Sequence, residues 1–292
     1  MNESADAAAG FELNRARLFG LAYRMLGSRA EAEDVVQEAY VRWHQSDRDT
    51  IRNAEAWLVT TATRLAIDRL RALRTEREAY VGPWLPEPLM HDTPPPPDRH
   101  LELASDLSVA FLVLLERLGP EERAAFLLHD VFDFGYGEIS AILEKSEEAC
   151  RQIVHRGRTR VRNARKRFEV TEEAKAALLR KFTEAVNARD GRTLLSLFAP
   201  DATWTADGGG RTAATPRPIV GADRIARLVL GLLDRLQGDV LTMELVDVNS
   251  ETGLCLRVNG RITAIMSIVT DGDRIHEVYA VVNPDKLGTL SH

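Results

Sequence analysis

The stretch SEEACRQIVHRGRTRVRNARKR, residues 146–167, decides how the N-terminal half of this chain folds. Ser146 is a helix N-cap type, and Glu147 and Glu148 suit the positive end of a helix dipole. Helical spacing predicts one buried stripe, made of Ala149, Ile153, Val154, Gly157 and Val161. The outer face is cationic, with Arg or Lys at positions 151, 156, 158, 160, 162, 165, 166 and 167. Runs of charged residues are commonly just solvated surface, so this helix alone does not indicate a function. The sequence upstream of it gives the evidence for one.

The residues just upstream predict a helix-turn-helix motif. The segment GYGEISAILEK (135–145) carries Ile139, Ile142 and Leu143 at helical spacing, and residues 144–146 suit a tight turn. In this layout the second helix enters the major groove of DNA. Arginines of that helix would hold phosphates, and its first turns would meet base edges.

Length and composition indicate a folded chain of about two domains. It has 292 residues, 45% of them hydrophobic, and no apolar run long enough to span a membrane. The N-terminus, MNESADAAAGFELNR, has no charged region followed by an apolar stretch, so we expect no secretory signal and a cytoplasmic location. Cys150 and Cys255 have no His or Cys at ligand spacing, which predicts no disulfide and no zinc site. We also expect no other metal and no cofactor.

The net charge of −6 is unusual for a DNA-binding protein. Residues 1–170 hold 24 basic and 28 acidic side chains, and the remainder holds 14 and 16. A protein that binds DNA unaided is usually more cationic, because phosphate neutralisation drives affinity. We therefore expect DNA binding within a larger assembly, or DNA binding that is masked in the free chain.

Three helices are predicted ahead of this motif. Residues 11–27 form an amphipathic helix that Gly27 would end, and Ser28 would cap the next helix. The second helix, 28–45, turns Val35, Val36, Ala39, Tyr40 and Trp43 inward. A third helix follows over 53–78, with Trp57, Leu58, Ala62, Leu65, Ala66 and Leu70 as its core stripe. Its other face mixes hydroxyl groups, Thr63 included, with arginines, a combination that suits single-stranded nucleic acid.

Three segments in this order resemble regions 2 and 4 of extracytoplasmic-function (ECF) sigma factors. They are AEDVVQEAYVRWHQ (32–45), AWLVTTATRLAIDRLRA (56–72) and the segment 118–162, which contains the helix-turn-helix. Three ordered blocks are much more specific than one helix-turn-helix alone. The resemblance implies sigma region 2 over 11–78, a Pro-rich linker over 79–105 and sigma region 4 over 106–168.

The resemblance also implies partners, namely core RNA polymerase and promoter DNA. It assigns polymerase binding to Asp34, Gln37, Glu38 and Arg42. Binding of the −10 element falls to Asn53, Trp57, Thr60, Thr61, Arg64, Asp68, Arg69, Arg71 and Arg74. Binding of the −35 element falls to Glu147, Glu148, Arg151, Gln152, His155, Arg156, Arg158 and Arg160.

The chain departs from the family at three positions. Glu144 stands where the turn commonly has glycine, and a left-handed backbone there would cost about 1 kcal/mol. Ile153 and Gly157 stand where the family often has a basic residue and alanine. The readout of individual bases is therefore not transferred to this chain.

The linker sequence YVGPWLPEPLMHDTPPPPDR (80–99) predicts an extended path, because its prolines exclude a regular helix. Trp84, Leu85 and Leu89 are apolar, and apolar side chains on a linker tend to dock on a surface. The motif WLPEPL (84–89) resembles a signature of the ECF subgroup that carries a fused C-terminal domain. A helix is expected over 101–118, interrupted at Gly119 and resumed at Pro120.

The C-terminal segment 171–287 changes to helices followed by alternating strands, an α+β pattern. Its order resembles the SnoaL-like polyketide cyclases, which implies a cone-shaped barrel with a curved antiparallel sheet and a central pocket. The fold class is thus multi-domain, with all-α N-terminal domains followed by an α+β SnoaL-like barrel. Candidate polar residues of the pocket are Trp204, Asp207, Arg257, Asp271, Asp273, His276 and Tyr279. Residues 271–273 are expected to form a hairpin turn.

Two further features fit a regulatory role. DGGGR (207–211) is predicted to be a flexible loop after a strand, where glycines permit unusual backbone angles. The tail NPDKL (283–287) resembles a terminal motif of the same ECF subgroup, whose extension regulates the sigma factor in cis. The regulatory residues implied are Trp84, Leu85, Pro86, Asp207, Gly208, Gly209, Arg211, Asn283, Pro284, Asp285 and Lys286. No paired base and nucleophile is evident, so we expect no enzymatic activity, and a small ligand in the pocket stays open. The alternatives are a cyclase or isomerase fused to a DNA-binding module, and a repressor that works without polymerase.

Overall fold

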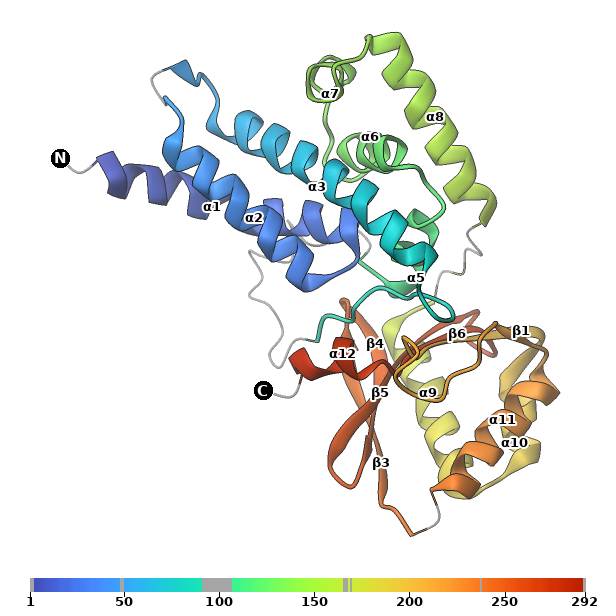
Figure 1. The fold of residues 1–292 in the computed structure, drawn as a ribbon. Helices are drawn as coiled ribbons and strands as arrows, with labels where there is room; N and C mark the ends of the chain where they lie inside the picture. Colours follow the sequence, from blue (N-terminus) through green and yellow to red (C-terminus); the bar gives the residue numbers. More distant parts are fainter. Residues whose placement is uncertain are drawn as a thin grey trace. The chain divides into compact units, whose positions relative to one another are not determined.

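The computed structural model describes residues 3–47, 50–90, 107–164, 168, 170–236 and 238–290. The chain divides into two compact units, which are treated separately (Figure 1). Among the described residues, the helical unit contains those up to Glu78, Leu107 and residues 111–164. The sheet unit contains residues 79–90, 108–110 and those from 168 onward.

Three long helices form the first part of the helical unit, α1 (Glu3–Leu26), α2 (Arg29–Gln45) and α3 (Ala54–Glu78). Gly27 ends α1 with a φ of 68°, and the Ser28 hydroxyl accepts from the Glu31 amide to cap α2. Both termini were predicted. The expected interior of α2 is buried except Tyr40, which is half-buried. The predicted stripe of α3 is correct for Leu58, Ala62, Ala66 and Leu70.

The second part of the helical unit contains α5 (Val109–Leu115) from Phe111 onward, α6 (Pro120–Asp130), α7 (Tyr136–Leu143) and α8 (Glu147–Ala164). Pro120 begins α6 as expected, and the Glu122 side chain accepts from the Gly119 amide. Helices α7 and α8 form the predicted helix-turn-helix, with the Ser146 hydroxyl capping α8. Of the helix expected over 101–118, only 107–118 lies within the described residues, and there α5 covers 109–115.

The two parts of the helical unit pack against each other. Helix α3 packs on α6 and α7, and α1 packs on α6. The turn between α6 and α7 lies against α1, where the Arg17 guanidinium is 5.4 Å from the centre of the Phe134 ring. Arg24 and Arg123 are completely buried here, at 0% and 1% exposure. Residues of α1 and α6, which are distant in sequence, therefore share one interior.

The sheet unit is built on six strands in the order β2-β1-β6-β5-β4-β3. Their bounds are β1 Phe198–Asp207, β2 Ile219–Val220, β3 Leu241–Val248, β4 Glu251–Val258, β5 Arg261–Thr270 and β6 Ile275–Val281. The sheet was expected to be antiparallel, but β1 and β6 pair in parallel. Gly272 lies in the predicted turn between β5 and β6, with a φ of 98°.

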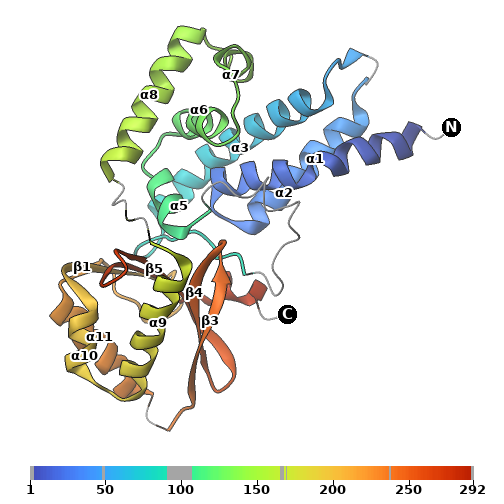
Figure 2. The same cartoon turned by 180° about the vertical axis from the view of Figure 1, so that it is seen from behind.

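Helices cover one side of this sheet, as both views show (Figure 2). They are α9 (Glu172–Asn187), α10 (Gly191–Leu197) and α11 (Ala222–Arg235), and the short α12 (Pro284–Leu287) and a 3₁₀ turn (Gly288–Leu290) follow β6. Leu178, Phe182 and Val186 of α9 are buried in the core as predicted, whereas Ala177 is half-buried. The core also includes Trp204 from β1 and Val229 from α11.

The linker residues 79–90 belong to the sheet unit and contain no helix. Leu85 is 1% exposed, and Met90 forms a β-bridge with Val248 at the end of β3. The linker thus runs along the sheet unit as an extended, docked segment, as its prolines and apolar residues predicted. The prolines at 94–97 lie outside the described residues.

Candidate nucleic-acid interface and linker-binding site

Helix α8 divides into a buried stripe and an exposed face. Ile153, Val154 and Val161 are buried as predicted, and Cys150 joins them at 0% exposure. Burial raises the pKa of the Cys150 thiol, and also that of Cys255 in the sheet unit. Both cysteines are free. On the exposed face, residues at spacings of four and three form one stripe of α8: Glu148, Gln152 and His155.

The arginines of α8 have carboxylate partners that the sequence interpretation did not foresee. Arg158 makes three contacts of 2.6 to 3.0 Å with Asp130 at the end of α6, and this interaction raises its pKa. Arg160 donates to Glu122 at 2.5 Å, and Arg156 lies 4.0 Å from the same carboxylate. Arg151 pairs with Glu147 at 2.7 Å. The four α8 arginines assigned to the −35 element therefore each lie beside a carboxylate.

The residues assigned to the −10 element lie along α3, where several also have local structural roles. Asn53 caps the helix by accepting from the Ala56 amide at 3.0 Å, and the Thr60 hydroxyl donates to a backbone carbonyl. Trp57 is half-buried against Trp43, with ring centres 5.5 Å apart. Thr61 is half-buried too, whereas Thr63, expected on the outer face, is 0% exposed.

Three arginines of α3, Arg64, Arg71 and Arg74, are held by the second part of the helical unit. Arg64 donates to the carbonyls of Ala141 and Ile142, both at 3.0 Å, at the end of α7. Arg71 pairs with Glu121 at 2.9 Å, and Arg74 donates to the Leu118 carbonyl at 2.7 Å. The remaining contacts are Arg64 to Glu144, Arg71 to Asp68, and Arg69 to Glu31 and Glu76. No local spacing in the sequence signals the α3 contacts to α6 and α7.

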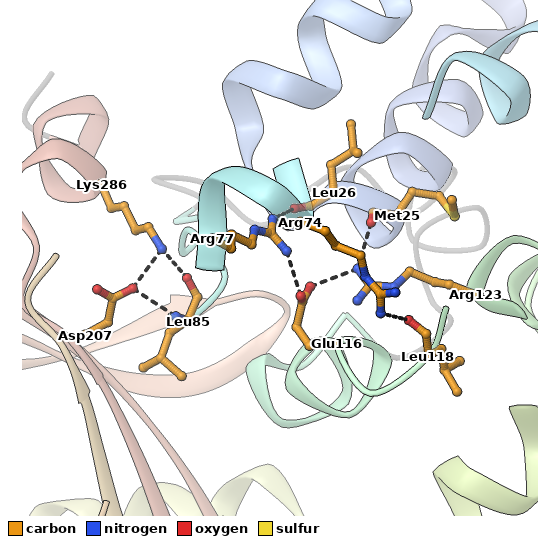
Figure 3. Close-up of polar contacts among 10 residues, drawn as sticks. All are labelled: Met25, Leu26, Arg74, Arg77, Leu85, Glu116, Leu118, Arg123, Asp207 and Lys286. Atoms are coloured by element: carbon orange, nitrogen blue, oxygen red, sulfur yellow. Dashed lines mark hydrogen bonds and ion pairs between the residues drawn. The ribbon is translucent and has the colours of Figure 1, made fainter. Parts of the chain in front are cut away.

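Glu116 forms ion pairs that the sequence did not predict, with residues of two helices (Figure 3). It accepts from Arg77 at 2.6 Å and from Arg123 at 2.8 Å. The same arginines donate to the Leu26 and Met25 carbonyls at the end of α1. Burial would raise the pKa of Glu116, but the charges of Arg123 and Arg77 outweigh burial and lower that pKa. One carboxylate thus ties α3 and α6 to the same helix end.

The residues assigned to polymerase binding lie together on the outer face of α2. Asp34, Gln37, Glu38 and Arg42 are all exposed, and Arg42 donates to Glu38 at 2.8 Å. Val41, at 37% exposure, adds an apolar side chain beside Arg42. This face combines charge with exposed apolar area.

In the sheet unit, Asp207 at the end of β1 is the centre of the linker-binding site (Figure 3). Its side chain is completely buried at 0% exposure. It accepts from the Tyr80 hydroxyl at 2.5 Å, the Leu85 amide at 2.9 Å and the Gly209 amide at 3.1 Å. Lys286 of α12 supplies the counter-charge at 2.7 Å. A buried charge needs this kind of pairing and hydrogen bonding to be tolerated.

Lys286 also contacts the linker directly. Its ammonium lies 4.2 Å from the centre of the Trp84 ring and 5.5 Å from that of Tyr80, and it also donates to the Leu85 carbonyl. A cation over aromatic faces is attracted by their π electrons. Burial, and then the bond to Asp207, raises the pKa of Tyr80. Tyr80 was not among the predicted residues, although it starts the linker segment.

The two predicted motif loops meet at this site. Asn283 donates to the Tyr80 hydroxyl at 3.0 Å, and Arg211 lies 3.2 Å from Asp285. Gly209 has a φ of 58°, and a Cβ there would lie 2.3 Å from the Asn283 amide nitrogen. Gly208, Pro284 and Pro86 belong to the same three segments. The structure therefore brings WLPEPL, DGGGR and NPDKL together.

The polar candidates for a catalytic pocket are not gathered at one site. Trp204 is buried in the apolar core, and Asp207 binds the linker. Asp271 lies 2.7 Å from His276, whose hydrogen bond lowers the pKa of Asp271 to about 2. The other candidates are Tyr279, bonded to Glu277, Arg257, paired with Glu244, and Asp273, exposed in the β5–β6 turn.

Comparison with known proteins identifies the family. Family models match residues 11–76 as Sigma-70 region 2, 108–161 as Sigma-70 region 4 and 179–282 as a SnoaL-like domain. Over 289 residues the chain is 36% identical to the ECF RNA polymerase sigma factor SigJ of Mycobacterium tuberculosis, covering 94% of this chain and 91% of that protein. The chain belongs to the ECF RNA polymerase sigma factors.

A solved structure and a second relative support the assignment of this ECF sigma factor to its family. The crystal structure of M. tuberculosis SigJ matches with a TM-score of 0.76 at 34% identity, covering 96% of this chain and 98% of that one. SigW of Bacillus subtilis is 29% identical over 159 residues, which cover 52% of this ECF sigma factor and 84% of SigW. These relatives are sigma factors and not enzymes, which confirms the expected absence of an enzymatic function. No described helix is both long and apolar enough for a membrane span.

Proposed function

We propose that this ECF sigma factor binds core RNA polymerase through the exposed face of α2 and directs it to promoters. The observation that supports the contact is the exposure of Asp34, Gln37 and Glu38 on one helix face, beside Arg42 and Val41. Charged groups around an interface steer and orient the partner, and exposed apolar area adds affinity.

A pull-down with core RNA polymerase tests this assignment. Asp34→Ala combined with Glu38→Ala should weaken the association roughly tenfold or more, as expected for charged residues central to an interface. Asp234→Ala, which removes an exposed carboxylate of the sheet unit, is the matched control. Equal retention of polymerase by both proteins would contradict the α2 assignment.

Promoter recognition falls to α3 and α8 in this proposal. On α8, Glu148, Gln152 and His155 form one exposed stripe, and within the described residues no hydrogen bond or ion pair of these side chains appears. Side chains of this kind hydrogen-bond base edges in the major groove, where Gln pairs with adenine and Glu with cytosine. We assign base readout to this stripe and phosphate contacts to the neighbouring arginines, which include Arg156, Arg158 and Arg160.

The C-terminal domain would regulate this activity in cis by holding the linker. Asp207 carries this proposal, because a completely buried carboxylate binds both Tyr80 and Leu85 of the linker and is neutralised by Lys286. The linker connects the two promoter-binding regions, which must reach their elements together. Its attachment to the sheet unit therefore controls how those regions can be placed on DNA.

In vitro transcription with core polymerase tests this regulation. Asp207→Asn and Lys286→Met each leave a buried polar group or charge without its partner, so either should release the linker and change promoter-dependent transcription several-fold. Asp234→Asn is the matched control, since its Arg189 pair is exposed. The same assay is applied to two further variants, a chain ending at Val170 and Asp285→Ala. Transcription equal to wild type in all four variants would rule the regulatory role out.

A further inference from the structure

Helix α6 (Pro120–Asp130) lies beside both sets of promoter-binding arginines. Its carboxylates Glu121, Glu122 and Asp130 are named here the α6 acid set. Glu121 pairs with Arg71 of α3 at 2.9 Å and with Lys145 of the helix-turn-helix at 3.2 Å. Glu122 and Asp130 pair with Arg160 and Arg158 of α8 at 2.5 and 2.6 Å. One helix thus neutralises cations from both regions.

The α6 carboxylates contact the arginine guanidinium groups with the same geometry that a phosphate would use. Both carboxylate oxygens of Asp130 contact the Arg158 guanidinium, a forked arrangement that arginine makes equally with phosphate. Glu122 is fixed by its bond from the Gly119 amide, and its side chain is 10% exposed. Its position is therefore set by the start of α6 and does not depend on the arginine.

A groove of about 750 Å³ lies at the start of this helix. Its lining includes Arg71 and Arg74 from α3, Arg156 and Arg160 from α8, and Glu121 and Glu122 between them. The groove gathers cations from the predicted −10 and −35 surfaces around two acids. In this arrangement a DNA phosphate and an α6 carboxylate compete for the same guanidinium groups.

We propose that the α6 acid set is an internal phosphate mimic, which occupies Arg71, Arg158 and Arg160 until promoter DNA displaces it. This inference rests on the promoter contacts proposed above. Ion pairs that are partly exposed are individually weak, so each one lowers DNA affinity only roughly twofold to fivefold. Together they reduce non-specific binding, which depends almost wholly on phosphate contacts, more than they reduce base readout. The local cationic surface and the net charge of −6 are then compatible.

Fluorescence anisotropy of the full chain on a labelled duplex without promoter sequence tests the proposal across a NaCl series. The variant combines Glu121→Gln, Glu122→Gln and Asp130→Asn. Glutamine at 122 keeps an acceptor for the Gly119 amide. We expect tighter binding at low salt and a steeper dependence of log K on log salt, by up to about 2.7 for three released arginines.

The control variant combines Glu12→Gln, Asp234→Asn and Glu244→Gln, three exposed acids that lie outside α6. It changes the net charge equally, so it measures the general electrostatic effect. Circular dichroism checks that both variants fold. If the triple variant does not fold, Asp130→Asn alone replaces it, and we then expect a smaller increase in the salt slope. A salt slope equal to that of the control would overturn the proposal.

A second arm separates this inference from the promoter assignment on which it rests. Arg158→Ala and Arg160→Ala in the otherwise native chain should lower promoter-dependent transcription with core polymerase. If transcription is unchanged, the assignment of α8 to the promoter fails, and the mimic fails with it. If transcription falls while the acid variant keeps the control slope, only the mimic fails. Lower promoter affinity of the acid variant at an unchanged slope would show that the acids orient the arginines, which also overturns the proposal.

Discussion

Glu144 carries a backbone conformation that its residue type disfavours. It ends α7 with a φ of 55° and a ψ of 45°, in the left-handed region. The helix-turn-helix of the family commonly has glycine at this position. Its carboxylate lies 3.0 Å from Arg64, so the side chain makes a contact that glycine could not make. Both groups of this pair are exposed, and exposed pairs contribute little free energy. Backbone strain therefore dominates at this position.

Two substitutions isolate the strain. Glu144→Gly and Glu144→Ala both remove the pair with Arg64, but only glycine relieves the left-handed conformation. We expect the glycine variant to be more stable than the alanine variant by about 1 kcal/mol in the free energy of unfolding. Urea unfolding followed by circular dichroism measures the difference. Equal midpoints and slopes for the two variants would show that residue 144 bears no strain.

At the scale of elements, charged side chains join helices that are distant in sequence. Arg77 of α3 and Arg123 of α6 both cap the end of α1, and Glu116 compensates both charges. The Arg123 side chain is 2% exposed, so a loss of this compensation leaves a buried charge unpaired. Such losses are more costly than the pair itself is stabilising. The Glu116 carboxylate thus stabilises the packing of α1, α3 and α6 by neutralising the arginines that join them.

Glu116→Gln should lower the free energy of unfolding at neutral pH by roughly 3 kcal/mol, because it removes one partner of a buried ion pair. Folding lowers the pKa of Glu116, so its contribution is complete above the unfolded value near pH 4.5. That contribution is lost as the pH falls through the lower folded value. Urea unfolding at a series of pH values should show the difference from wild type shrinking in acid. A difference that is constant with pH would refute this role, and Glu138→Gln, an exposed acid on α7, is the control.

At the scale of the whole molecule, the linker belongs to the sheet unit although it follows α3 directly in sequence. Its attachment uses Asp207 and Lys286 at one end and the bridge from Met90 to Val248 at the other. Asn249 reinforces the second end, since its side chain accepts from the Leu89 amide at 2.9 Å. The covalent order of the chain therefore differs from the grouping of its folded units.

Limited proteolysis with chymotrypsin measures this attachment in the full chain. Cleavage after Tyr80, Trp84 or Leu89 requires the linker to leave the sheet unit, so its rate reports the open population. Asp207→Asn should raise that rate by roughly tenfold or more, since a lost charged hydrogen bond costs about 1.5–3 kcal/mol. Asp234→Asn should leave the rate as in wild type. Equal cleavage of both variants would contradict the role of Asp207 in holding the linker.

Sequence alone determined the features that depend on neighbouring residues. These are the ends of α1 and α2 at Gly27 and Ser28, the helix-turn-helix over α7 and α8, and the turn around Gly272. Caps, turns and amphipathic stripes rest on contacts between residues a few positions apart, so spacing is sufficient to predict them. The ordered motifs also indicated the ECF family, which the relatives confirm.

Only the tertiary structure decided which of the predicted residues are free to act. Arg64 meets Ile142 across 78 positions, and Tyr80 meets Asp207 across 127. A guanidinium or carboxylate binds any complementary group that folding brings within reach, and spacing along the chain does not specify that partner. For this reason the arginines were correctly seen as a cationic face of α8, while their neutralisation by α6 was not foreseen. Asp207 was likewise placed in a loop motif, and only folding made it the buried centre of the linker-binding site.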